Sequence, residues 1–144
     1  RFGMLPQIKR LPELEPLSRS LEIQSMNPKA KTIQELKVQR HRKKLVQLRS
    51  SIAELVQEQR FHPESVILFG SYARGDFNGF SDIDLIVVDR SRDQAVRLAA
   101  VLQEQGLADD VLTFDMEQWS QKQVSKSAFW KSVREEYITL YEHA

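Results

Sequence analysis

The chain has 144 residues, a formal net charge of +1 and no cysteine. Its length fits one domain with one core, and its near-neutral charge favours no class of partner. The lack of cysteine excludes disulfides, thiolate metal sites and a cysteine nucleophile; with no secretory segment and no membrane-spanning apolar run, we expect a cytoplasmic protein.

The N-terminal segment, residues 1–28, differs in composition from the rest of the chain. It holds four of the five prolines among scattered leucines, with no stretch long enough for a good helix. We therefore expect an extension over residues 1–28, whose order the sequence does not decide, followed by one domain over residues 29–144.

The segment from Thr32 to about Gln59 has the pattern of a long helix. Its apolar residues recur at spacings of three and four (Leu45, Leu48, Ile52 and Leu55). Thr32 stands three residues before Glu35, which is the spacing of a capping box. The helix is expected to end before His62-Pro63, because a residue that precedes proline avoids helical geometry.

The rest of the chain alternates short apolar runs with helical patterns. The predicted strands are Ser65–Phe69, Asp82–Val88 and Asp110–Phe114. The predicted helices are Ser71–Gly75, Arg92–Gln105 and Phe129–Glu142. The continuous apolar end of the second strand indicates burial on both faces. This order predicts an α/β (α+β) fold, with a small mixed sheet flanked by helices.

Gly70-Ser71 lies where the first strand meets the short helix. Glycine allows a phosphate to approach the backbone closely, free N–H groups at a helix start favour an anion, and the Ser71 hydroxyl can donate a further hydrogen bond. By itself, such a pair is more often only a turn.

Asp82 and Asp84 begin the second predicted strand. Residues two apart on a strand point to one face, so the two carboxylates should project together. Close like charges resist burial and are stabilised by a cation, and hard oxygen ligands favour Mg²⁺. The alternative is that both acids simply end a strand at the surface.

Asp110 begins the third predicted strand. If that strand lies beside the second, Asp110 can join the same cluster, bind a second metal ion and take a proton from an attacking hydroxyl. Asp109 and Asp115 are the competing candidates for this role. Asp109 precedes the strand and Asp115 follows it, so we prefer Asp110.

Two segments together carry a family resemblance. Leu-Phe-Gly-Ser-Tyr-Ala-Arg-Gly at 68–75 and Ser-Asp-Ile-Asp-Leu-Ile-Val-Val at 81–88 resemble the signature of the DNA polymerase β-like nucleotidyltransferases. The chain is most similar to the minimal nucleotidyltransferase (MNT) family, over about residues 32–144. The spacer between the segments, residues 76–80, is more aromatic than is usual in the family.

The resemblance implies a role for each matching residue. Gly70 and Ser71 would hold the triphosphate of ATP. Asp82 and Asp84 would bind two Mg²⁺ ions, and Asp110 would activate the acceptor hydroxyl. Arg74 would either reach phosphate or pair with a nearby acid and brace the loop. Tyr72 would touch the nucleotide or support the loop.

The resemblance also implies a partner. MNT proteins of this size resemble the antitoxin of a pair with a HEPN-domain ribonuclease toxin, and the chain is short for the acceptor domains of larger relatives. It would then transfer AMP from ATP to a tyrosine hydroxyl of the toxin. The alternatives are a non-catalytic antitoxin that occludes the toxin, and transfer to a small-molecule or nucleic-acid hydroxyl.

Two further features remain open. Residues 29–49 contain eight lysines and arginines against one acid, Glu35. Such a run can bind nucleic acid, but a solvated helix face is the more common explanation. Trp119, Phe129 and Trp130 could stack a base or meet a partner, although aromatic residues near a terminal helix more often serve packing.

Overall fold

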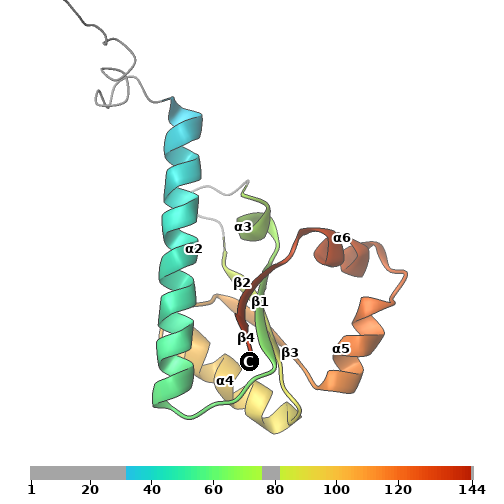
Figure 1. The fold of residues 1–144 in the computed structure, drawn as a ribbon. Coiled ribbons are helices and arrows are strands. Elements are labelled where there is room, and N and C mark those ends of the chain that lie inside the picture. The colour runs from blue at the N-terminus through green and yellow to red at the C-terminus, as the bar shows by residue number, and fades with distance from the viewer. Residues whose placement is uncertain (1–31, 76–81, 144) are drawn as a thin grey trace, which may run out of the picture. The chain divides into compact units, whose positions relative to one another are not determined.

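The structure, a computed structural model, describes residues 32–75 and 82–143 (Figure 1). Residues 1–41 and 42–144 form two parts, which are described separately. The predicted extension and the spacer over residues 76–80 lie outside the described residues. The elements are α2 (Ile33–Glu58), β1 (Ser65–Phe69), α3 (Ser71–Arg74), β2 (Asp84–Val88), α4 (Arg92–Glu104), β3 (Asp110–Phe114), α5 (Met116–Gln123), α6 (Ala128–Glu136) and β4 (Ile138–Glu142).

The long helix α2 has the predicted start. The Glu35 N–H donates to Thr32 Oγ1 at 3.0 Å, and the Thr32 N–H donates to Glu35 Oε1 at 2.8 Å, so the capping box is confirmed. Residues 32–41, which lie in the first part, are the first turns of this helix. In the second part, α2 buries an apolar stripe made of Leu48, Ile52, Leu55 and Val56. None of the described helices is long and apolar enough to cross a membrane.

The four strands form one mixed sheet in the order β3-β2-β1-β4. Strand β1 runs antiparallel to β2 and β4, whereas β2 and β3 are parallel. Parallel neighbours need a long crossover, and α4 provides it. The register pairs Asp84 with Phe69 on one side and with Asp110 on the other. The expected mixed sheet with flanking helices is therefore confirmed.

Helices cover both faces of the sheet (Figure 1). Leu85 and Val87 of β2 pack in a core with α4 and with α2 from Leu45 onward. Ile86 and Val88 point the other way and pack with Val133 of α6, with Phe114, Trp119 and Trp130 around them. Strand β2 is therefore buried on both sides, as its uninterrupted apolar run predicted.

The predicted last helix over Phe129–Glu142 is wrong in its second half. Helix α6 ends at Glu136, Tyr137 is extended with φ −67° and ψ 157°, and Ile138–Glu142 form β4 against β1. The apolar spacing in this segment fits a helix face, but its β-branched and aromatic residues also suit a strand, and pairing with β1 decides between the two. Helix α5 was not predicted, and β2 begins at Asp84 rather than Asp82.

Candidate active site

Gly70 joins β1 directly to α3. Its backbone has φ 82° and ψ −160°, a conformation that side chains with a Cβ rarely adopt. Its carbonyl accepts hydrogen bonds from the N–H groups of Ala73 at 3.1 Å and Arg74 at 3.2 Å. The chain can turn this sharply from a buried strand into a short helix because position 70 has no side chain.

Asp84 lies directly against Gly70. A Cβ at position 70 would stand only 2.9 Å from Asp84 Oδ2. The register explains this contact, since Phe69 opposite Asp84 is the last residue of β1 and Gly70 follows it. The glycine turn and the predicted metal-binding acid are thus brought together by the antiparallel pairing of β1 and β2.

Asp110 is placed beside Asp84 by the parallel pairing of β2 and β3. Paired residues on neighbouring strands share a face, which here is the face covered by α5 and α6. Burial raises the pKa of Asp84 most, and the negative charges of Asp110, Asp82 and Asp109 raise it further. The three predicted acids therefore lie close enough to influence one another.

The two competing acids have structural roles. The Asp109 carboxylate accepts a hydrogen bond from the Ile83 N–H at 2.7 Å, and the Asp109 N–H donates to the Ile83 carbonyl at 2.9 Å. These bonds hold the starts of β2 and β3 together. Asp115 accepts from the Gln118 N–H at 2.8 Å and caps α5, at the other end of β3. Of the three candidates, Asp110 is the residue that the register pairs with Asp84.

The acids fit a hard divalent cation by their chemistry. Within residues 32–75 and 82–143, no three acidic, histidine or cysteine side chains already converge on one point. Asp82 and Asp110 are exposed and Asp84 is half-buried, so their carboxylates are accessible oxygen donors with mutually unfavourable charge. A cation bound among them would offset that repulsion, and oxygen ligands of this kind suit Mg²⁺.

Tyr72 and Arg74 follow Gly70 on α3, with different surroundings. Tyr72 is buried in the core on the α2 and α4 side of the sheet, and burial raises its pKa. Its packing favours support of the turn over contact with a nucleotide. Arg74 forms an ion pair with Glu136 of α6 at 3.3 Å. The bracing interaction foreseen for Arg74 is therefore present in this structure.

Sequence reasoning missed Glu136. It was read as one position within a helix that continued to Glu142, and nothing in the sequence pattern links it to Arg74, 62 residues earlier. Glu136 Oε1 also accepts a hydrogen bond from Ser132 Oγ at 3.1 Å. The last turn of α6 thus presents an oriented carboxylate next to the glycine turn.

The Arg74–Glu136 pair is expected to add little stability. Its side chains are 38% and 35% exposed, and exposed ion pairs contribute at most about 1 kcal/mol. The variant Glu136→Gln, which removes one charge of the pair, should therefore unfold in urea with a free energy within about 1 kcal/mol of the wild-type value. A loss several times larger would mean that the pair anchors the turn.

A cavity of about 200 Å³ opens beside Asp84. One wall is formed by the glycine turn and by Asp84 at the start of β2, and the other by α6. Its lining residues are Phe69, Gly70, Arg74, Asp84, Phe129, Ser132, Val133 and Glu136. The cavity is therefore lined by residues of the predicted site and by residues of α6, which the sequence pattern does not associate with that site.

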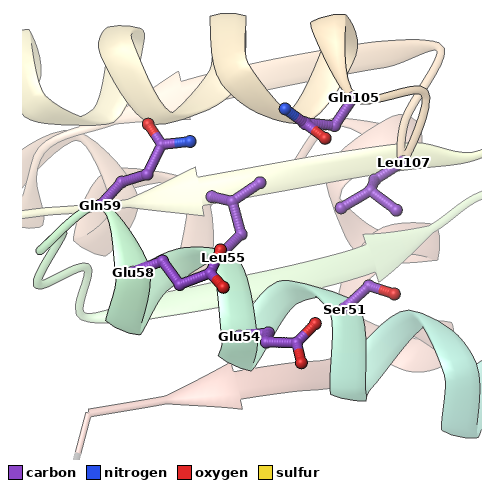
Figure 2. Close-up of a pocket in the computed structure, with 7 residues that line it drawn as sticks. All are labelled: Ser51, Glu54, Leu55, Glu58, Gln59, Gln105 and Leu107. Atoms are coloured by element: carbon purple, nitrogen blue, oxygen red, sulfur yellow. The ribbon is translucent and has the colours of Figure 1, made fainter.

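A second cavity, of about 190 Å³, lies between α2 and the end of α4. Figure 2 shows Glu54 and Glu58 of α2 facing it, with Gln105 and Leu107 on the opposite side. Leu55 and Leu107 belong to the core on the α2 and α4 face of the sheet, whereas Asp84 and Asp110 lie on the other face. This cavity is therefore separate from the acids.

Comparisons with known proteins give the following matches. A sequence model described as "Nucleotidyltransferase domain" matches residues 47–134, a range that includes Gly70, Asp82, Asp84 and Asp110. No curated protein matches the chain. A candidate nucleotidyltransferase from Sulfolobus solfataricus is 20% identical, with a TM-score of 0.46, over 74% of this chain and 86% of that one.

Two other similar structures are toxin–antitoxin structures. One, with AMP-PNP, is 22% identical, with a TM-score of 0.44, over 65% of this chain and 73% of that one. The other, a mutant of the toxin–antitoxin MntA–HpeT, is 20% identical, with a TM-score of 0.43, over the same shares.

Proposed function

Because this chain belongs to the nucleotidyltransferase domain family, we propose that it transfers AMP from ATP to a tyrosine hydroxyl of a HEPN ribonuclease toxin and thereby neutralises the toxin. The observation that carries the transferase chemistry is the placement of Asp84 against Gly70 and beside Asp110. The choice of acceptor rests on the resemblance of the two motif segments to MNT antitoxins.

Each residue of the proposed site has a separate role in this reaction. Gly70 and Ser71 would hold the triphosphate, and Asp82, Asp84 and Asp110 would hold two Mg²⁺ ions. Bound Mg²⁺ would neutralise charge on the entering and leaving oxygens. Asp110 takes the proton of the attacking hydroxyl, whose oxygen forms a bond to the α-phosphorus while the bond to pyrophosphate breaks. The products are the AMP ester of the hydroxyl and pyrophosphate.

A protein-borne acceptor suits the exposure of this site. Asp110 is exposed at the start of the edge strand β3. Leu112, two residues along on the same face, is 36% exposed, so the surface next to Asp110 is open. A hydroxyl on the surface of a folded partner can therefore approach Asp110 without entering a deep cavity. A small-molecule acceptor would need no such open surface.

Label transfer tests this proposal. The purified protein is incubated with ATP labelled at the α-phosphate, Mg²⁺ and the product of the adjacent gene. We expect label on a tyrosine of that partner, located by mass spectrometry, and no label with the variant Asp82→Asn/Asp84→Asn. The matched control is Asp93→Asn, which changes an exposed acid of α4 and should leave transfer intact.

Two other results would contradict the proposal. If the wild-type protein neither binds ATP nor labels any partner, the transferase chemistry is wrong. If the double variant still neutralises the partner fully and without label, the protein acts as a binding antitoxin instead.

A further inference from the structure

We propose that the cavity beside α6 binds the nucleobase of the nucleotide, with Phe129 packing against the ring and Glu136 accepting a hydrogen bond from an exocyclic amino group. This inference rests on the proposed function, since it extends the same nucleotide site. It predicts that the protein prefers ATP to UTP, and it assigns that preference to α6.

The position of the cavity supports this occupant. Gly70 and Asp84, which hold the phosphates and metal in the proposed function, form one of its walls. Phe69 and Val133 supply buried apolar surface. The volume of about 200 Å³ is below the range of pockets that enclose whole drug-sized ligands, so it suits a base better than a complete nucleotide.

Phe129 has the features of a stacking surface. It is 51% exposed, which is unusual for a large apolar side chain that lines a cavity. Its ring is oriented by edge-to-face contacts with Phe69 at 6.1 Å and Trp130 at 4.9 Å, measured between ring centroids. A ring that neighbouring aromatics already orient loses little freedom when a base packs against it.

Glu136 supplies the polar contact. Ser132 Oγ and Arg74 Nη1 both contact Oε1, which orients the carboxylate. Among the described residues, no hydrogen bond or ion pair occupies Oε2, so this oxygen can accept a bond from a ligand. An ionised carboxylate accepts hydrogen bonds and donates none. It therefore favours bases with an exocyclic amino group, which uracil lacks, since uracil offers only its ring N3–H as a donor on that edge.

The test compares two probes, ATP and inorganic tripolyphosphate, both with Mg²⁺ and measured by isothermal titration calorimetry. Tripolyphosphate reports on the phosphate site alone, whereas ATP reports on both sites. Phe129→Ala should weaken ATP binding roughly tenfold and leave tripolyphosphate binding unchanged. Phe129→Leu, which keeps apolar volume against Phe69 and Trp130, should show the same selective loss in a folded protein.

Glu136→Ala tests the polar contact. The wild-type protein should bind ATP more tightly than UTP, and this variant should reduce the ratio of the two affinities at least about fivefold. Any effect on the phosphate site through Arg74 would change the affinities for ATP and UTP alike and therefore cancels in this ratio. The matched controls are Glu135→Ala and Tyr137→Ala, exposed neighbours that do not line the cavity and should leave every ratio unchanged.

The outcomes separate this inference from the proposed function. If the wild-type protein binds neither probe, both are overturned. If it binds ATP but the Phe129 and Glu136 variants keep wild-type ratios, the base pocket alone is overturned. If these variants lower label transfer to a partner without changing ATP affinity, the cavity receives the acceptor, and the base pocket is likewise overturned.

Discussion

Replacing Asp84 with asparagine is expected to lower nucleotidyl transfer about a thousandfold or more and, in the absence of metal, to raise the melting temperature. In the proposed reaction, the loss follows because an amide is a neutral and poor ligand for the cation that would stabilise charge in the transition state. Transfer would be measured with labelled ATP under saturating Mg²⁺, so that weaker metal binding is separated from slower chemistry.

The gain in stability follows from the surroundings of the carboxylate. Burial and the charges of Asp110, Asp82 and Asp109 raise the pKa of Asp84, which means that its ionised form is less favourable in the folded chain than in the unfolded chain. Asparagine removes that charge. We therefore expect the melting temperature to rise in the absence of metal.

The exposed acid Asp93 provides the control for both measurements. Asp93→Asn should leave transfer near the wild-type value and should not raise the melting temperature, because Asp93 lies in the first turn of α4, where a negative charge is favourable. A fall in the melting temperature of the Asp84→Asn protein would mean that the carboxylate stabilises the fold, which contradicts the expectation that its charge is unfavourable in the absence of metal. An active site that gains stability when it loses function is the usual trade-off for clustered charge.

The strands β1, β2 and β3 could be predicted from sequence because local signals agreed with their final environment. β1 is a short apolar run between Pro63 and Gly70, and β3 is a short run that begins at Asp110. Both strands have the predicted bounds. The uninterrupted apolar residues of β2 predicted burial on two faces. These features depend on the burial of each strand, which its own residues report.

The end of the chain could not be predicted in this way. Residues 137–142 fit a helix by spacing and a strand by residue type, and the deciding factor is that β1 has an edge to which β4 can bind. That edge is a property of the sheet. Once β4 returns along β1, α6 is brought to the glycine turn, and Glu136 meets Arg74.

The candidate site, too, could be predicted only where it depends on local sequence. Strand geometry predicts that Asp82 and Asp84 project together, but β2 begins at Asp84, so Asp82 lies before the strand. The pairing of Asp84 with Asp110 requires that β2 and β3 be neighbours. That condition concerns the order of strands in the sheet, which no residue pattern within β2 or β3 determines. The wall formed by Phe129, Ser132 and Glu136 depends on long-range packing, so no local pattern marks it as part of a site.

Gly70→Ala should have the second large effect, on both stability and activity. The added Cβ would stand 2.9 Å from Asp84 Oδ2, in a backbone conformation with φ 82° and ψ −160° that is almost restricted to glycine. We expect a loss of about 1–3 kcal/mol in the free energy of unfolding, measured with urea. We also expect ATP binding and transfer to be lost, because the displaced carboxylate and turn form the site.

Gly106 offers a matched control in the same chain. It also has a positive φ, 74°, but a Cβ there would meet no atom within 4 Å. Gly106→Ala should therefore cost about 1 kcal/mol through backbone strain alone and retain transfer in the folded protein. If Gly70→Ala lost no more transfer than Gly106→Ala, close approach of Asp84 to the turn would not matter for catalysis. A loss specific to position 70 would mean that the turn and the acid act as one unit.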